Sequence, residues 1–121
     1  MKKVIRISPI IFTAIILLLT RGCKKEVPES LTQPATNLSL SGATLNGYVN
    51  PNGLSTTVTF EYDTTTNYAN TVTASQNPVS GNGLTDVSAV ITGLTTGKTY
   101  HFRVKAENSH WTVYSSDNEF E

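Results

Sequence analysis

Histidine, cysteine and carboxylate side chains are the groups through which this chain could carry out acid–base or nucleophilic chemistry. It contains two histidines, His101 and His110, and one cysteine, Cys23. Such chemistry requires the reactive group to be held beside a nucleophile or a second acid–base group. No motif places such a partner beside either histidine. We therefore expect two solvated surface histidines in a protein that is not an enzyme.

The sequence predicts no metal site and no cofactor. It lacks a histidine and cysteine cluster at zinc-ligand spacing and an Asp-x-Asp-x-Asp calcium loop. Glu61 and Asp63 lie on the same face of a predicted strand, but two surface carboxylates are usually only solvated. Gly81-Asn82-Gly83 lacks the strand and helix that flank a phosphate-binding loop.

The distribution of charge argues against nucleic-acid binding. Six of the nine basic residues lie in the first 25 positions. From Leu31 onward, three bases stand against seven acids, which gives a formal charge of −4. A mildly acidic domain lacks the basic patch that a phosphate backbone requires. Because there is a single cysteine, an intrachain disulfide is excluded and the core alone must hold the domain.

The first 25 residues have the pattern of an export signal. Lys2, Lys3 and Arg6 precede an apolar run over residues 10–19, which is shorter than the ~20 residues that a membrane-spanning helix needs. The cysteine follows directly after Gly22.

This arrangement resembles a bacterial lipoprotein signal. In that family a small residue precedes the cysteine, the peptide is cleaved there, and the new N-terminal cysteine receives lipid. The resemblance implies a signal peptide over residues 1–22, a palmitate-type lipid on Cys23 and a cell-envelope location, periplasmic or at the surface. Arg21 departs from the family pattern, which has a small or uncharged residue at that position. An uncleaved signal anchor and an ordinary signal peptide with an incidental cysteine are the alternatives.

A flexible tether and a single β-rich domain are predicted to follow. Residues 23–32 are mostly polar and show no apolar periodicity, as in a linker. From Ala35 onward, apolar and polar residues alternate between turn residues, which indicates half-buried antiparallel strands. We expect strands over residues 43–49, 57–63, 68–74, 87–91, 100–107 and 112–120, the last with Tyr114 and Phe120 facing inward.

The strand over residues 100–107 has the clearest pattern. Its apolar residues share one face and its ionisable residues the other, so a one-residue slip would bury four ionisable groups. The inward set is Tyr100, Phe102, Val104 and Ala106, and the outward set is His101, Arg103, Lys105 and Glu107. Short strands with turns every 8–12 residues are typical of an all-β sandwich.

Residues 43–53, 58–62 and 91–108 resemble a bacterial fibronectin type III domain. The resemblance implies a seven-stranded antiparallel Greek-key sandwich over residues 33–121. Leu94, Gly97 and Tyr100 match the family's turn between its fifth and sixth strands, where the tyrosine hydroxyl bonds back to the turn as a tyrosine corner. Thr96 replaces the family's proline.

The family's inward tryptophan on the second strand is also missing. Gly47 and Val49 occupy that face, so we expect a core that is smaller or differently filled, by Tyr62, Tyr100 and Phe102.

Three aromatic residues are candidate ligand contacts. Trp111, the single tryptophan, lies in the predicted loop between the last two strands, Tyr48 on an outer strand face and Tyr68 near a strand start. Exposed aromatic rings can stack on sugars or anchor a protein partner. The alternative for Trp111 is that it folds back over the edge of the sandwich.

Three functional hypotheses follow from the sequence. The first is a non-catalytic lipoprotein module for binding, adhesion or spacing at the cell envelope, attached to the membrane by lipid and contacting a protein or glycan. The second is a carbohydrate-recognition module that uses Trp111 with Tyr48 or Tyr68. The third is the anchoring start of a longer envelope enzyme, although the chain ends where the last strand would end.

Overall fold

The computed structural model describes residues 26–121; the predicted signal peptide and Cys23 lie outside this range. The described residues form eight strands and no helix. The strands are β1 (Glu29–Thr36), β2 (Ala43–Asn50), β3 (Thr57–Asp63), β4 (Asn70–Thr73), β5 (Thr85–Ile91), β6 (Tyr100–Glu107), β7 (Thr112–Tyr114) and β8 (Asn118–Phe120). Accordingly, no helix in residues 26–121 is long and apolar enough to cross a membrane.

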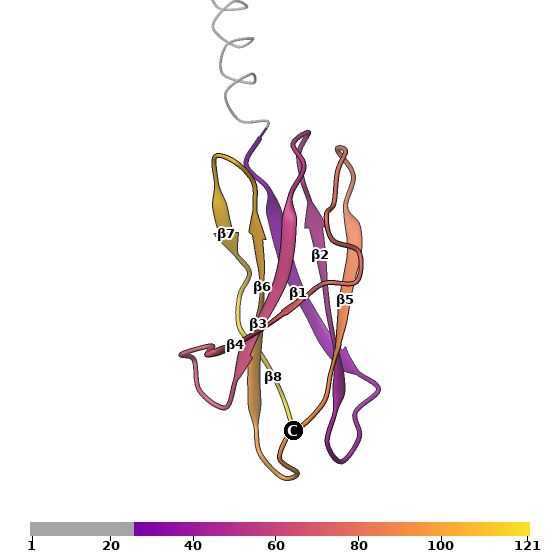
Figure 1. Ribbon diagram of the computed structural model, residues 1–121, viewed down its shortest axis with the longest axis vertical. Helices are drawn as coiled ribbons and strands as arrows, with labels where there is room; N and C mark the ends of the chain where they lie inside the picture. Colours follow the sequence, from indigo (N-terminus) through magenta and orange to yellow (C-terminus); the bar gives the residue numbers. More distant parts are fainter. Residues whose placement is uncertain (1–25) are drawn as a thin grey trace, which may run out of the picture.

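The strands form two antiparallel sheets that face each other (Figure 1). The smaller sheet has the order β1-β2-β5, and the larger has the order β4-β3-β6-β7, with β8 also paired to β6. The chain crosses between the sheets after β4, where Ala74 N–H bonds to Val58 O and Ser75 N–H to Ser88 O. The predicted all-β sandwich is confirmed.

The core fills the space between the sheets. β2 and β6 alternate strictly between buried and half-buried residues up to their last positions, and the inward face predicted for β6 is confirmed. Phe60 and Phe102 are the largest fully buried side chains, with ring centroids 6.4 Å apart. Tyr100 is also buried, and Tyr62 packs at the edge of the core. Phe60, on β3, therefore contributes more to the hydrophobic core than Tyr62, which was the residue expected there.

At Gly47 the backbone of β2 approaches β6 too closely for any side chain. A Cβ atom there would lie 2.6 Å from Val104 Cγ2 and 2.7 Å from the carbonyl oxygen of Leu31. The inward side of β2 at Gly47 is thus closed by Val104, and the sheets pack around a glycine.

The last predicted strand is divided into β7 and β8, so the structure has eight strands where seven were predicted. Lys105 pairs with Tyr114, whereas Phe102 pairs with Asn118, so one extra residue is accommodated between the two pairs, as in a β-bulge. Beyond this bulge Phe120 packs inward on Phe102, as predicted. Tyr114, before the bulge, is exposed, and the inward orientation predicted for it is wrong.

The bulge is held by Ser115. Its backbone N–H bonds to Val104 O at 2.9 Å, and its hydroxyl accepts the Val104 N–H at 2.7 Å, in place of a backbone carbonyl. The hydroxyl also lies 2.5 Å from the Thr32 hydroxyl, which in turn donates to Ser116 O. Because β1 belongs to the other sheet, this network links the two sheets along one side.

β1 begins at Glu29, inside the segment predicted as a tether. The residues before it are held as well, because Asn52 Nδ2 donates to Val27 O at 2.7 Å and Asn108 Nδ2 to Glu26 O at 2.6 Å. These contacts use backbone carbonyls and polar side chains, so they leave no apolar pattern in residues 26–32.

Candidate functional site

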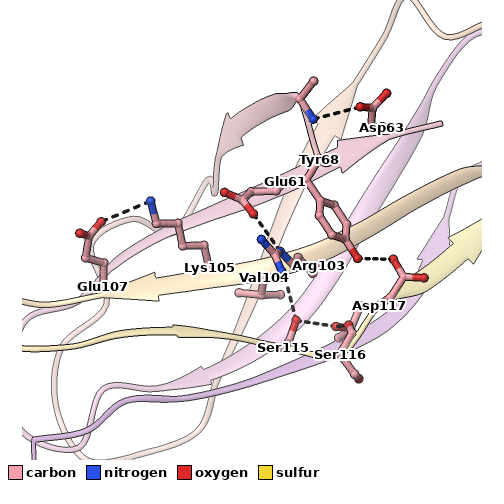
Figure 2. Close-up of polar contacts among 12 residues, drawn as sticks. Glu61, Asp63, Tyr68, Arg103, Val104, Lys105, Glu107, Ser115, Ser116 and Asp117 are labelled. Atoms are coloured by element: carbon pink, nitrogen blue, oxygen red, sulfur yellow. Dashed lines mark hydrogen bonds and ion pairs between the residues drawn. The ribbon is translucent and has the colours of Figure 1, made fainter. Parts of the chain in front are cut away.

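Arg103 lies at the centre of a polar cluster on the outer face of the larger sheet (Figure 2). It occupies an outward position on β6, directly opposite Glu61 on β3. Its Nε donates to Glu61 Oε1 at 2.8 Å, and the Glu61 side chain is only 13% exposed. A shielded carboxylate therefore fixes the guanidinium in one orientation.

Two tyrosine rings enclose this guanidinium. The Arg103 Cζ atom lies 4.1 Å from the ring centroids of both Tyr68 and Tyr114, within the range of a cation–π contact. Tyr68 comes from the β3–β4 loop and Tyr114 from β7, so the larger sheet and its loop converge on one side chain. We call these two rings together with Glu61, Arg103 and Asp117 the Arg103 cluster.

The carboxylate of Asp63 shapes the loop that carries Tyr68. It accepts the backbone N–H of Thr64 at 2.7 Å and that of Ala69 at 3.1 Å. These two bonds, the one from Ala69 first, hold the pKa of Asp63 below its ordinary value. Between them the chain turns sharply, and Tyr68 adopts a φ of +51°, a left-handed conformation that is uncommon for a large side chain. Asp63 thus places the ring over Arg103.

Asp117 joins Tyr68 to His101. The Tyr68 hydroxyl donates to Asp117 Oδ1 at 2.5 Å, and His101 Nδ1 lies 2.8 Å from Asp117 Oδ2. Burial, followed by this hydrogen bond, raises the pKa of Tyr68 to about 12. The hydrogen bond to Asp117 is also the main cause that raises the pKa of His101.

His101, Asp117 and Glu119 are the described residues that could offer ligands to a divalent cation. One ligand atom from each lies within 4.8 Å of the others. His101 and Glu119 are directly paired across β6 and β8, with 3.6 Å between Nδ1 and Oε2. In the structure both carboxylates are turned toward His101 Nδ1.

The two histidines have different surroundings. His110 is largely exposed and lies 4.0 Å from Glu26. His101 is only 20% exposed and contacts two carboxylates, so the expectation of a solvated side chain is correct for His110 and wrong for His101. Among residues 26–121, no hydroxyl group is hydrogen-bonded to either ring.

The three aromatic residues singled out in the sequence lie in three different parts of the sandwich. Tyr68 belongs to the Arg103 cluster. Tyr48 lies on the outer face of the smaller sheet, in a hollow of about 440 Å³ lined by Pro34 and Asp86 among others. Trp111 lies in the β6–β7 turn, 48% exposed. The three candidate ligand contacts thus come from three different elements of the sandwich.

Most of the Arg103 cluster was not singled out from the sequence. Tyr114 was assigned to the core because the bulge after it shifts the alternation. Asp117 lies inside that bulge, where no pairing partner can be read from the sequence. The Glu61–Arg103 pair could have been found by aligning β3 against β6, since both residues were expected on outward faces.

The turn before β6 has the contact expected of a tyrosine corner. The Tyr100 hydroxyl accepts the backbone N–H of Thr95 at 2.8 Å, and the Tyr100 ring stacks on Phe120 with centroids 5.6 Å apart. Leu94 packs against the core, and Gly97 has a φ of +81°.

The described residues thus form a two-sheet sandwich with a pre-shaped polar and aromatic surface on one face. No protein-family model and no curated protein matches the chain. Among solved structures, it is similar to the sensor domain of the anti-sigma factor RsgI4 from Pseudobacteroides cellulosolvens. A short form of that domain is 26% identical with a TM-score of 0.58, covering 78% of this chain and 92% of that one. A long form is 24% identical with a TM-score of 0.56, covering 78% and 87%.

Proposed function

We propose that the chain is a non-catalytic binding module of a bacterial cell-envelope lipoprotein, with a fibronectin type III fold, and that it contacts a partner through the Arg103 cluster. The observation that carries the proposal is the Arg103 guanidinium enclosed by the rings of Tyr68 and Tyr114. Aromatic residues and arginine dominate binding hot spots, because they bring large contact area with little loss of side-chain freedom when already held in place.

The strand arrangement supports the fibronectin type III assignment. When β7 and β8 are counted as one interrupted strand, the sheets β1-β2-β5 and β4-β3-β6-β7 contain seven strands. The hydrogen bond from Thr95 to Tyr100 is the second support.

The lipoprotein assignment rests on the order of basic residues, apolar run, Gly22 and Cys23. The similarity to the sensor domain of an anti-sigma factor supports a sensing or binding role for the module. Labelled palmitate incorporated by the expressed chain, and absent from Cys23→Ala, is the expected result. Labelling that survives the substitution would show that the cysteine is not the acylation site.

A protein partner is favoured over a glycan by the state of the tyrosine rings. Sugars stack on open ring faces, whereas Arg103 already covers one face of Tyr68 and one face of Tyr114. The guanidinium and the neighbouring carboxylates instead suit the charged and polar rim of a protein interface.

The binding face is tested by comparing variants on the two sheets. The full chain, Tyr114→Ala and Tyr48→Ala are used to capture partners from envelope extract, and the captured protein is then titrated against each. We expect Tyr114→Ala to weaken binding by roughly tenfold or more, while Tyr48→Ala, on the smaller sheet, binds normally. If Tyr114→Ala binds normally and Tyr48→Ala loses binding, the partner contacts the smaller sheet, and the proposed role of the Arg103 cluster is wrong.

Glycan recognition remains the second candidate, because Tyr114 is 48% exposed and an exposed aromatic ring can stack on a sugar. A glycan array probed with the full chain separates the two. Specific sugar binding that Tyr114→Ala abolishes would favour the glycan, and a blank array together with a captured protein would favour the first proposal.

A further inference from the structure

We propose that the end of the sandwich carrying Trp111 rests against the lipid surface to which the chain is anchored. This inference rests on the lipid at Cys23 proposed above. It concerns where the domain sits once anchored, and so it can fail while the anchoring itself is correct.

Asn108 connects the start of the described chain to the turn that carries Trp111. Its Oδ1 accepts the backbone N–H groups of His110 and Trp111, both at 2.8 Å, and its N–H donates to Trp111 O at 2.9 Å. The same side chain donates from Nδ2 to Glu26 O at 2.6 Å. The tryptophan turn and the first described residue are therefore held together.

The reach of the chain from this point to the proposed lipid is short. Cys23 precedes Glu26 by three positions, which even a fully extended chain spans in only about 10 Å. Because Val27 is held by Asn52, little further reach is gained before β1. A lipid on Cys23 would thus keep this end of the sandwich at the membrane surface.

The same end exposes apolar side chains. The β2–β3 loop, the β4–β5 loop and the β6–β7 turn lie together there, beside the start of β1 (Figure 1). Trp111 is 48% exposed and Leu84, directly before β5, is 56% exposed. Tryptophan favours the boundary between lipid headgroups and acyl chains, where its ring is buried and its N–H stays wet.

Charge determines which lipid surface this end should meet. Glu26 and Glu107 are exposed there, and His110 lies beside Glu26. Carboxylates are repelled by anionic headgroups and lysines are attracted; because Lys24 and Lys25 directly precede Glu26 in the sequence, the charges near the anchor balance, and a zwitterionic surface is the appropriate probe.

The single tryptophan makes the contact directly measurable. The full lipidated chain is reconstituted into phosphatidylcholine vesicles with and without phosphatidylcholine brominated near the headgroup, which quenches tryptophan only at contact range. We expect the anchored chain to lose most of its Trp111 emission to the brominated lipid, with a blue shift. Cys23→Ser, added to the same vesicles, is expected to lose almost none.

Two variants test the geometry. In the first, about twelve Gly and Ser residues, spanning roughly 20 Å, are inserted between Lys25 and Glu26, which should remove most of the quenching. In the second, Trp111→Phe is combined with Leu40→Trp, which moves the reporter to the opposite end of the eight-residue β2, about 26 Å away. This reporter should not be quenched.

Flotation of the vesicles separates the two possible failures. A chain that floats with the lipid but keeps its Trp111 emission would overturn the inference and leave the anchor intact. A chain that does not float would overturn the anchor as well. Equal quenching of the Leu40→Trp reporter would show that the domain lies on its side and would also overturn the inference.

Discussion

Single residues decide how closely the two sheets approach and how the outer face is charged. Gly47 permits β2 to lie against Val104, and Asp117 gives one carboxylate to two partners from different elements. Neither role follows from residue type alone. Both can be tested by single substitutions, because each should change stability, or its dependence on pH, in a predictable direction.

Gly47→Ala is expected to destabilise the fold. The added methyl group would overlap both Val104 and the Leu31 backbone, and strain of this kind costs about 1–3 kcal/mol. The measurement is the free energy of unfolding in urea. Gly83→Ala is the matched control, because a Cβ there has nothing within 4 Å. Equal stability of the Gly47→Ala and Gly83→Ala variants would contradict the close approach.

His101 is expected to make stability depend on pH. Its pKa is raised in the folded state, chiefly by the hydrogen bond to Asp117. Its contribution is thus complete below the ordinary value of 6.5 and is lost as the pH rises through the higher folded value. The groups facing it are Asp117 and Glu119 from the β8 side and Asp63 across β3.

Thermal unfolding of the wild type at about pH 5.5 and about pH 8 brackets this titration. We expect a smaller difference in Tm between the two conditions for His101→Asn than for the wild type. Asp117→Asn should also reduce it, because it removes the carboxylate that favours the protonated ring. An unchanged difference in both variants would exclude His101 as the source.

At the scale of elements, two irregular segments are held in place by side-chain hydrogen bonds. The bulge between β7 and β8 links the sheets through Ser115 and Thr32, and the β3–β4 loop positions Tyr68. Both replace regular backbone pairing by side-chain hydrogen bonds. Each should therefore depend on one polar residue more than a regular strand would.

Ser115→Ala is expected to cost about 1–3 kcal/mol of stability. The buried Val104 N–H would lose its acceptor, and a buried donor without a partner costs about that much. Ser116→Ala is the matched control, since Ser116 contributes its backbone carbonyl to the network. Chemical denaturation of the two variants measures the difference. Equal stability would mean that the Val104 N–H finds another acceptor.

Asp63→Ala is expected to release the β3–β4 loop while the sandwich stays folded. Without the carboxylate, the N–H groups of Thr64 and Ala69 lose their acceptor, and the left-handed conformation of Tyr68 is no longer supported. In NMR spectra the Tyr68 ring signals should move toward those of a free tyrosine. Thr66→Ala, an exposed substitution in the same loop, should leave them in place.

At the scale of the whole molecule, regular alternation was predictable and its interruptions were not. The strand over residues 100–107 has apolar and charged residues on opposite faces, so its register could be read directly. β1 could not be read in this way, because its burial alternates along the strand while its residue types do not: the half-buried positions carry mostly polar residues, and a register shift interrupts the pattern after Gln33. The bulge at Ser115 turns Tyr114 to the outer face, opposite to the orientation predicted for it. The contact between Tyr114 and Arg103 could therefore not be predicted either.

The two facing sheets have four outer strand edges, and such edges invite pairing with another chain. The bulge at Ser115 interrupts the edge formed by β7 and β8. The edge strand β4 has only four residues, which is too short for extended pairing with another chain. Pro34 and a register shift break the edge of β1.

The edge of β5 is covered from its own chain. Gln76 Oε1 accepts the Ser88 N–H at 2.8 Å, and the Ser75 N–H bonds to Ser88 O. With every edge interrupted, short or covered, copies of the domain at high concentration would resist joining into a continuous sheet. The irregular segments that made the sequence hard to read thereby protect the domain from aggregation.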